Sequence, residues 1–208
     1  MTRVRVKFCG ITRPEDAAEA ARLGVDAIGL VFYAGSPRAV TAAQARQVLD
    51  VLAPFVSKVG LFVNAQRGEI DRILSAISID FLQFHGDETP EQCRLYGKPY
   101  IKAIRMRPNI DVSREASRYE DATALLLDAY QEGIQGGTGT SFDWARVPHD
   151  LHKPVILAGG LTPANVAAAI AQVRPYAVDV SGGIEAARGV KDPAKMREFI
   201  QEVQRGCS

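Results

Sequence analysis

The stretch Lys7-Phe8-Cys9-Gly10-Ile11-Thr12 decides how the rest of the chain is interpreted. It closes an alternating apolar run typical of a β-strand, and Thr12 with Glu15 forms a capping box that predicts a helix start. Cys9 is therefore expected where a strand gives way to a loop, with Gly10 allowing the backbone to turn. Ligands of parallel α/β proteins bind at this end of the strands, so the later segments are examined as partners of that thiol.

An apolar run followed by a helix start recurs along the whole chain. The eight predicted strands comprise residues 4–9, 27–32, 59–63, 81–85, 100–105, 124–128, 154–158 and 177–181. Repeated strand–helix alternation implies a parallel sheet with right-handed crossovers. Eight units with no strand out of pattern predict an α/β fold that closes into a (β/α)8 TIM barrel rather than an open doubly wound sheet. The chain is short for that fold, which predicts one barrel domain over residues 1–208.

Helix signals separate the strands. The clearest starts are capping boxes at residues 41–44 and 89–92 and the dipeptides Thr162-Pro163 and Asp192-Pro193. Between the sixth and seventh strands, a glycine-rich loop at residues 136–140 leads to a short helical segment at 142–144.

Composition excludes several classes of protein. The chain has 208 residues, is 47% hydrophobic and carries a net charge of +1 with no basic stripe, which argues against a nucleic-acid partner. No apolar run is long enough for a membrane span, and a strand follows the first residues directly, so neither a membrane partner nor a signal peptide is expected. The three cysteines, Cys9, Cys93 and Cys207, are odd in number and far apart, which predicts a cytoplasmic location without disulfides.

The ends of the predicted strands supply the candidate site. In order, these positions are Cys9, Phe32, Asn64, His85, Arg105, Asp128, Gly159 and Ser181. A thiol on the first strand and a carboxylate on the sixth lie on roughly opposite walls of a closed ring, where both can reach one ligand. The alternatives are a small buried hydrophobe for Cys9 and a loop residue for His85. For Asp128 we favour function, since an unpaired buried charge is costly. Cys93 and Cys207 are expected to be inert.

Glycine pairs after the last two strands predict a phosphate site. Gly159-Gly160 follows the seventh strand, and Ser181-Gly182-Gly183 follows the eighth. Backbone amides exposed by small residues at these two strands bind phosphate in many (β/α)8 enzymes, although either pair alone is also explained by a tight turn. Asp179 is expected to point into the barrel, where it can hydrogen-bond to the ligand or to neighbouring residues. Arg38, in the loop after the second strand, is expected either to bind a substrate carboxylate or to remain a solvated charge.

No motif for a metal or a cofactor is found in the sequence. The three histidines are too scattered to form a ligand set, and both the dinucleotide fingerprint and the phosphate-binding P-loop motif are missing. We therefore expect a barrel that works without a cofactor on a small phosphorylated molecule bearing a carboxylate. A thiol paired with a carboxylic acid suits proton transfer, that is, an isomerisation. The expected assembly is a monomer or a homodimer.

Motifs along the whole chain resemble those of phosphoribosylanthranilate isomerases of tryptophan biosynthesis. The matching stretches, besides the first strand, are Ser36-Pro37-Arg38, Phe62-Val63-Asn64, Gln83-Phe84-His85-Gly86, Leu127-Asp128, Gly136-Gly137-Thr138-Gly139, Phe142-Asp143-Trp144, Leu157-Ala158-Gly159-Gly160-Leu161, Asn165-Val166 and Asp179-Val180-Ser181. One departure is that relatives often carry a serine where this chain has Gly182 and a valine where it has Ile184.

The resemblance implies an Amadori rearrangement of N-(5-phosphoribosyl)anthranilate to 1-(2-carboxyphenylamino)-1-deoxyribulose 5-phosphate. It implies Cys9 as general base, Asp128 as general acid, and Arg38 as the residue that holds the anthranilate carboxylate. From their positions near the strand ends, His85 and Asp179 are expected to be further substrate contacts. This chemistry needs a thiolate at Cys9 and a protonated Asp128, the reverse of their ordinary states at neutral pH. The thiolate requires a cation or hydrogen-bond donors near Cys9.

Two other functions share some of these features. Another phosphosugar barrel enzyme would use the same phosphate loops, but an epimerase needs a metal-ligand set and an indole-forming synthase needs lysine–glutamate pairs at the strand ends. A non-catalytic phosphosugar-binding barrel would tolerate the loss of Cys9 and Asp128 with changes in affinity only.

Overall fold

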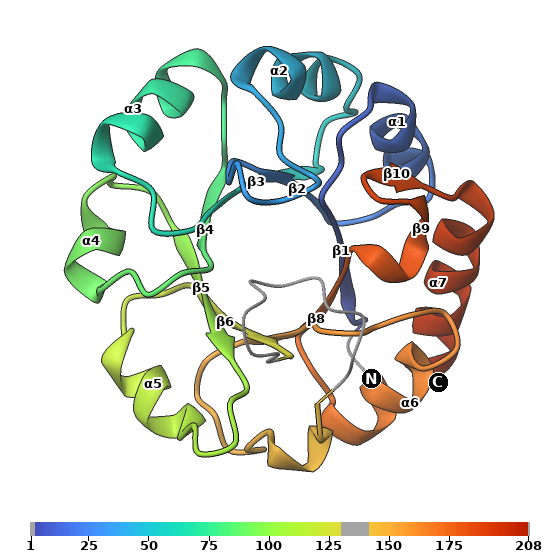
Figure 1. The fold of residues 1–208 in the computed structure, drawn as a ribbon. Coiled ribbons are helices and arrows are strands. Elements are labelled where there is room, and N and C mark those ends of the chain that lie inside the picture. The colour runs from blue at the N-terminus through green and yellow to red at the C-terminus, as the bar shows by residue number, and fades with distance from the viewer. Residues whose placement is uncertain (1–2, 130–141, 208) are drawn as a thin grey trace.

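Eight parallel strands form a closed barrel in the computed structural model, which describes residues 3–129 and 142–207. The ring closes because β1 pairs with β8, from Arg5 opposite Ala177 to Phe8 opposite Val180. Figure 1 shows the strands at the centre, surrounded by helices. The strands are β1 (Arg5–Cys9), β2 (Ala27–Val31), β3 (Ser57–Phe62), β4 (Phe81–Phe84), β5 (Tyr100–Arg105), β6 (Ala124–Asp128), β7 (Val155–Leu157) and β8 (Ala177–Val180). The predicted TIM barrel is confirmed.

The helices pack around the outside of the ring (Figure 1). They are α1 (Pro14–Arg22), α2 (Ala42–Asp50), α3 (Arg67–Ala76), α4 (Pro90–Arg94), α5 (Val112–Arg118), α6 (Val166–Val173) and α7 (Pro193–Gly206), together with the 3-10 turns η1 (Trp144–Arg146) and η2 (Gly182–Ile184). The predicted glycine-rich loop at 136–140 lies outside the described residues.

Local capping signals located most of the helix starts. Thr41 and Thr89 form the predicted capping boxes, and Asp192 caps α7 by accepting from the backbone of Ala194 and Lys195. The predicted capping box at Thr12 is wrong: α1 begins after Arg13, which makes no side-chain cap, and the Thr12 hydroxyl donates to the Gly189 carbonyl instead.

The start of α6 was also predicted too early, because this helix begins at Val166 rather than at Thr162. The backbone N–H of Thr162 donates to the Asn165 side chain, so residues 162–165 form a turn ahead of the helix. A short antiparallel hairpin, β9 (Glu185–Ala187) and β10 (Val190–Lys191), was not predicted at all.

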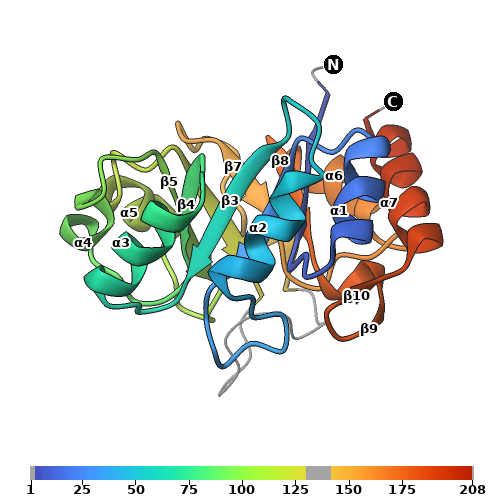
Figure 2. The same ribbon diagram turned by 90° about the horizontal axis from the view of Figure 1, so that it is seen from above.

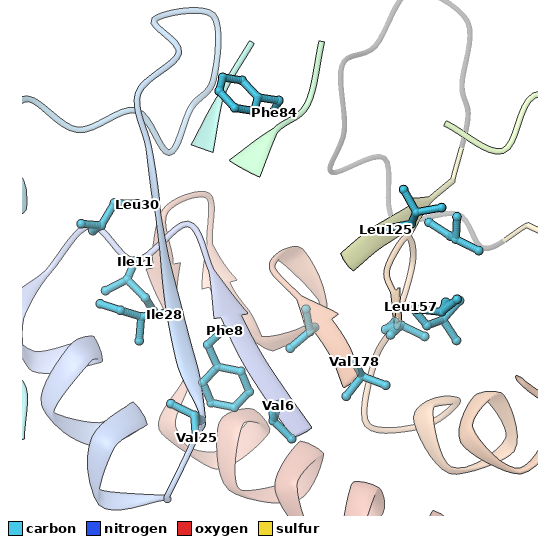
Figure 3. Packing of buried hydrophobic residues seen from close by; sticks show 14 of the residues in the cluster. Val6, Phe8, Ile11, Val25, Ile28, Leu30, Phe84, Leu125, Leu157 and Val178 are labelled. Atoms are coloured by element: carbon cyan, nitrogen blue, oxygen red, sulfur yellow. The ribbon is translucent and has the colours of Figure 1, made fainter. Parts of the chain in front are cut away.

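Strand alternation sorts the buried residues into an outer and an inner layer. Phe8, Ile28 and Leu125 belong to the large cluster between the strands and the helices, part of which is shown in Figure 3. The inner layer of the barrel is a separate cluster of smaller side chains: Val59, Ile101, Ala103, Ala124, Leu126, Ile156, Ala158 and Ala177. Cys9 follows Phe8 and therefore faces the interior.

The two ends of the barrel differ in what they carry. Figure 2 shows both chain termini at one end and the β9–β10 hairpin at the other, where the strands finish. The carboxyl ends of the strands thus share their side of the barrel with an extra hairpin, which lies beside the candidate site described below. Among the described residues, no helix is long and apolar enough to cross a membrane.

Candidate active site

A cavity of about 480 Å³ opens at the carboxyl ends of the strands. All ten residues that the sequence predicted as site residues line it: Cys9, Arg38, His85, Asp128, Gly159, Gly160, Asp179, Ser181, Gly182 and Gly183. Their roles stay predictions, but the barrel brings them together from six of its strand ends and loops. This position follows from topology, because parallel strands that close into a ring direct all their carboxyl ends to one mouth.

One wall of the cavity is apolar. Val31, Leu61 and Val63 line it, form a buried cluster with Cys9, and have Tyr33 packed against them. These side chains come from β2, β3 and the residues just after them. A planar aromatic group can therefore lie against this wall without burying polar atoms.

Asp128 is held by a short chain of side chains, Gln83 on β4 and His85 directly after that strand. Its Oδ2 lies 3.0 Å from His85 Nε2, and His85 Nδ1 lies 3.0 Å from Gln83 Nε2. With the Gln83 amide donating to Nδ1, the ring proton is on Nε2 and is donated to the Asp128 carboxylate. Both ring nitrogens of His85 are thus engaged with protein groups. Asp128 lines the cavity, and its other carboxylate oxygen makes no hydrogen bond within the described residues.

Cys9 lies beside a buried ion pair. Lys7 Nζ is 2.8 Å from Asp179 Oδ1, and both side chains are less than a tenth exposed. Burial raises the pKa of the Cys9 thiol above its ordinary value, the Lys7 ammonium opposes this rise, and the Asp179 carboxylate adds to it. Burial alone would lower the pKa of Lys7, but Asp179 and Cys9 keep it raised overall. Lys7 is therefore a cation of the kind that the predicted thiolate needs, and in the ligand-free state it is shared with Asp179.

The two predicted phosphate loops are in contact with each other and with Ala129, the residue after β6. Gly159 has a φ of +80°, and a Cβ atom there would lie 2.3 Å from the backbone nitrogen of Ala129. A Cβ atom at Gly183 would lie 1.9 Å from the carbonyl oxygen of Leu161. Because no side chain fits at either contact, these two positions require glycine. The loops after β7 and β8 are thereby held close together at the cavity mouth.

Arg38 is paired with an acidic residue that sequence reasoning did not select. Its Nε and Nη2 lie 2.7 and 2.8 Å from the two carboxylate oxygens of Glu185, in a bidentate arrangement. Lys191 Nζ lies 3.0 Å from the same carboxylate. Burial alone would raise the pKa of Glu185, but Arg38 and Lys191 hold it below its ordinary value. Arg38 is therefore a fixed cation at the cavity rather than a solvated charge.

A second buried pair supports the His85 loop from behind. Lys102 Nζ lies 2.9 Å from Glu88 Oε2 and donates to the Gly86 carbonyl at 2.7 Å. Glu88 in turn accepts from the backbone N–H groups of Asn64 and Gly86. This network holds the backbone at Asn64, after β3, and at Gly86, after β4. It thereby also fixes the direction in which the neighbouring His85 points.

Several polar residues of the site were therefore missed from the sequence. For Lys7 and Gln83 a signal was available, because each lies two positions before a predicted site residue and alternation places it on the same face of its strand. Glu185 and Lys191 gave no such signal, since they lie on a hairpin that was not predicted and Glu185 pairs with Arg38, 147 residues away. The described residues contain no group of three or more metal-ligating side chains.

Comparisons with known proteins identify the family of this chain. The sequence model of the family N-(5'phosphoribosyl)anthranilate (PRA) isomerase matches residues 6–202. An N-(5'-phosphoribosyl)anthranilate isomerase of Nitrosococcus oceani is 62% identical over 201 residues, which cover 97% of this chain and 98% of that protein. The phosphoribosyl anthranilate isomerase of Thermotoga maritima has a similar crystal structure, with a TM-score of 0.88, 39% identity, and coverage of 97% of this chain and 98% of that one.

Two further solved structures bear on ligand and assembly. A phosphoribosyl anthranilate isomerase in complex with reduced 1-(o-carboxyphenylamino)-1-deoxyribulose 5-phosphate matches with a TM-score of 0.85 and 38% identity over 97% of this chain and 98% of that one. Monomers derived from the dimeric Thermotoga maritima enzyme match with a TM-score of 0.82 and 36% identity over the same shares. Because the family model spans residues 6–202 and the Nitrosococcus oceani relative is 62% identical along nearly the whole chain, this chain belongs to the family of phosphoribosylanthranilate isomerases.

Proposed function

We propose that this chain carries out the isomerase reaction of its family, in tryptophan biosynthesis, with Cys9 as general base and Asp128 as general acid. The observation that carries the proposal is their placement on the walls of one cavity, at the ends of β1 and β6. The substrate class is that of the solved relative whose bound ligand is a reduced carboxyphenylamino-deoxyribulose phosphate.

The cavity offers a matching surface for each part of N-(5-phosphoribosyl)anthranilate. We place the phosphate on the backbone amides of Gly160, Gly182 and Gly183, with Ser181 and Gly159 shaping the loops. The anthranilate ring lies against the apolar wall of β2 and β3, and its carboxylate meets Arg38, which lies in the loop that follows β2. The ribose then spans the middle of the cavity, between Cys9 and Asp128.

Asp128 starts the reaction by protonating the ribose ring oxygen. The bond between that oxygen and C1′ breaks, and the anilino nitrogen supplies the electrons that form a Schiff base. The hydrogen bond from His85 Nε2 stabilises the Asp128 carboxylate that remains after proton transfer. His85, predicted as a substrate contact, is thus proposed to position Asp128, since both of its ring nitrogens already have protein partners.

Cys9 completes the isomerisation as a thiolate that removes the C2′ proton. The electrons of that C–H bond form the enolamine, which tautomerises to the ketone product. Lys7 favours the thiolate through its charge, while Asp179 opposes it and pairs with Lys7. A substrate hydroxyl that donates to Asp179 would weaken the hold of this carboxylate on Lys7, so substrate binding itself would favour the thiolate.

The test is a kinetic comparison of Cys9→Ala and Asp128→Asn with the unchanged protein. Each variant is expected to lower kcat by about 10²- to 10⁴-fold, the usual effect of losing a general acid or base. KM and the melting temperature should change much less, because both substitutions are small. The assay follows loss of phosphoribosylanthranilate fluorescence with no metal or cofactor added.

Cys93→Ala is the matched control, since Cys93 is buried on α4 and does not line the cavity. Its kcat should be close to that of the parent protein. A near-normal kcat for Cys9→Ala or for Asp128→Asn would refute the role of that residue. A purely structural Cys9 would instead give a lower melting temperature with the chemistry intact.

The other phosphosugar chemistries considered from the sequence receive no support. An indole-forming synthase needs lysine–glutamate pairs at the strand ends, but the described residues that line the cavity include no lysine. Lys102 and Glu88 form such a pair behind the His85 loop, outside the cavity.

For the assembly, the dimeric Thermotoga maritima relative favours a homodimer over a monomer.

A further inference from the structure

We propose that Glu185, on the β9–β10 hairpin, is a positioning residue that determines which edge of the Arg38 guanidinium meets the substrate carboxylate, and so sets selectivity for the carboxylated aromatic amine. The inference rests on the proposed function, in which Arg38 binds that carboxylate. Glu185 itself does not line the cavity, whereas Arg38 does.

The hydrogen-bond geometry decides which donors remain. A guanidinium has five N–H groups in a fixed plane. Glu185 accepts from Nε at 2.7 Å and from Nη2 at 2.8 Å, so the side edge of the group is occupied. Three N–H groups remain, one on Nη2 and two on Nη1, and they form the end edge of the guanidinium. Among the described residues, Nη1 has no hydrogen-bond acceptor. A carboxylate can bind this end edge with two parallel hydrogen bonds.

The surrounding backbone prevents Arg38 from choosing another orientation. A Cβ atom at Gly10 would lie 2.5 Å from Arg38 Cδ, and one at Gly182 would lie 3.2 Å from Nη2. The stem and the head of Arg38 are thus packed directly against the backbone of β1's end and of the phosphate loop. The side chains of Arg38 and Glu185 are only 13% and 5% exposed, so water cannot replace their pairing at little cost.

Lys191 keeps this arrangement attractive to anions. An arginine paired with a glutamate alone is neutral overall and would hold a carboxylate weakly. Lys191 Nζ lies 3.0 Å from Glu185 Oε1 and 3.1 Å from the Ser181 carbonyl. The group of Arg38, Glu185 and Lys191 therefore carries one net positive charge, and it links the carboxylate end of the site to the phosphate loop.

The experiment is a double-mutant cycle on Arg38→Met and Glu185→Gln. Glu185→Gln is nearly isosteric and replaces one acceptor oxygen by a donor, so it should release the side edge of Arg38. We expect KM for phosphoribosylanthranilate to rise roughly 10- to 100-fold, as for the loss of a charge-assisted pair, with kcat changed less than about threefold. Arg38→Met should have an effect of similar size, and the double variant should be no worse than Arg38→Met alone.

Two controls separate positioning from a general structural role. The inhibition constant of inorganic phosphate should rise less than KM in Glu185→Gln, because the phosphate is proposed to bind the amides of Gly160 and Gly183 as well as that of Gly182, the one next to Arg38. Asp26→Asn breaks an acid–arginine pair with Arg3, which lies before β1 at the other end of the barrel, and should leave KM unchanged. If Glu185→Gln unfolds below the assay temperature, Glu185→Asp can replace it. Aspartate keeps the negative charge but its side chain is too short to reach Arg38 in the same way, so KM should also rise.

Each outcome bears on a different statement. A KM within twofold of the parent in Glu185→Gln, beside a raised KM in Arg38→Met, would overturn the positioning role and leave the proposed function standing. Effects that multiply in the double variant would also overturn it, since Glu185 would then act without Arg38. An unchanged KM in Arg38→Met would refute the carboxylate contact itself, and the inference with it.

Discussion

Gly183→Ala is expected to damage the phosphate site more than the fold. A Cβ atom at Gly183 would lie 1.9 Å from the Leu161 carbonyl oxygen, whereas real Cβ atoms essentially never come closer than 3.0 Å to another heavy atom. The loops after β7 and β8 must therefore separate by at least about 1.1 Å, the difference between these two distances. The obstacle is backbone, so no rotation of a side chain can relieve it.

The magnitude follows from the hydrogen bonds that the loops are proposed to make. A bond of about 2.9 Å that lengthens by about 1.1 Å is no longer a hydrogen bond. One lost bond to a charged phosphate is worth about 1.5–3 kcal/mol, which corresponds to about 10- to 100-fold in affinity. The free energy of unfolding should fall by about 1–3 kcal/mol, the usual cost of an overpacked site.

Calorimetric titration with inorganic phosphate measures this loss directly, and steady-state kinetics should give a KM raised by the same factor. Gly68→Ala is the matched control: a Cβ atom there would meet nothing within 4 Å, and the position is in α3. It should leave phosphate binding unchanged and stabilise the helix by about 0.5–1 kcal/mol. A phosphate affinity in Gly183→Ala within twofold of the parent would show that these loops do not hold the phosphate.

Two further predictions concern the thiols. Lys7→Met should slow alkylation of Cys9 by iodoacetamide at a fixed pH, and Asp179→Asn should speed it, because Lys7 favours the thiolate and Asp179 opposes it. Mass spectrometry of the Cys9 peptide measures both rates, and equal rates in all three proteins would contradict the assignment. Burial raises the pKa of Cys93 to about 12, so its contribution to stability is complete below pH 9 and is lost as the pH rises above that value. Cys93→Ala should therefore show a smaller alkaline decrease in Tm than the parent, and an identical decrease would contradict this.

The barrel itself could be read from the sequence, because its strands are buried on both faces. The strands predicted at residues 100–105 and 124–128 agree with β5 and β6 at both ends. Residues 124–127 are a continuous apolar run closed by Asp128, and residues 100–105 are an apolar run interrupted by Lys102 and closed by Arg105, which leaves little freedom in placing the ends. Eight such runs in strict alternation with helices then permit few topologies other than a closed ring.

Local signals failed where a distant group held the side chain instead. Thr12 has the sequence of a capping box, yet its hydroxyl donates to the carbonyl of Gly189, which belongs to the turn between β9 and β10. The hairpin that supplies this acceptor consists of short strands without an alternating apolar pattern, so periodicity gave no sign of it. A capping box is a local preference of about 1 kcal/mol, and one tertiary hydrogen bond is enough to override it.

In the candidate site too, some features follow from the sequence and others only from the tertiary structure. The sequence by itself determined which residues reach the mouth of the barrel, since strand order and the two-residue alternation place Cys9, Asp128 and Asp179 on inner faces near the carboxyl ends. Tertiary structure alone decided which charged groups pair. Lys7 and Asp179 are 172 residues apart, and Arg38 and Glu185 are 147 residues apart. Periodicity specifies the face on which a side chain lies, because it depends only on backbone geometry. The choice of partner depends on ring closure and on the cost of leaving a buried charge unpaired, and neither is a property of a local segment.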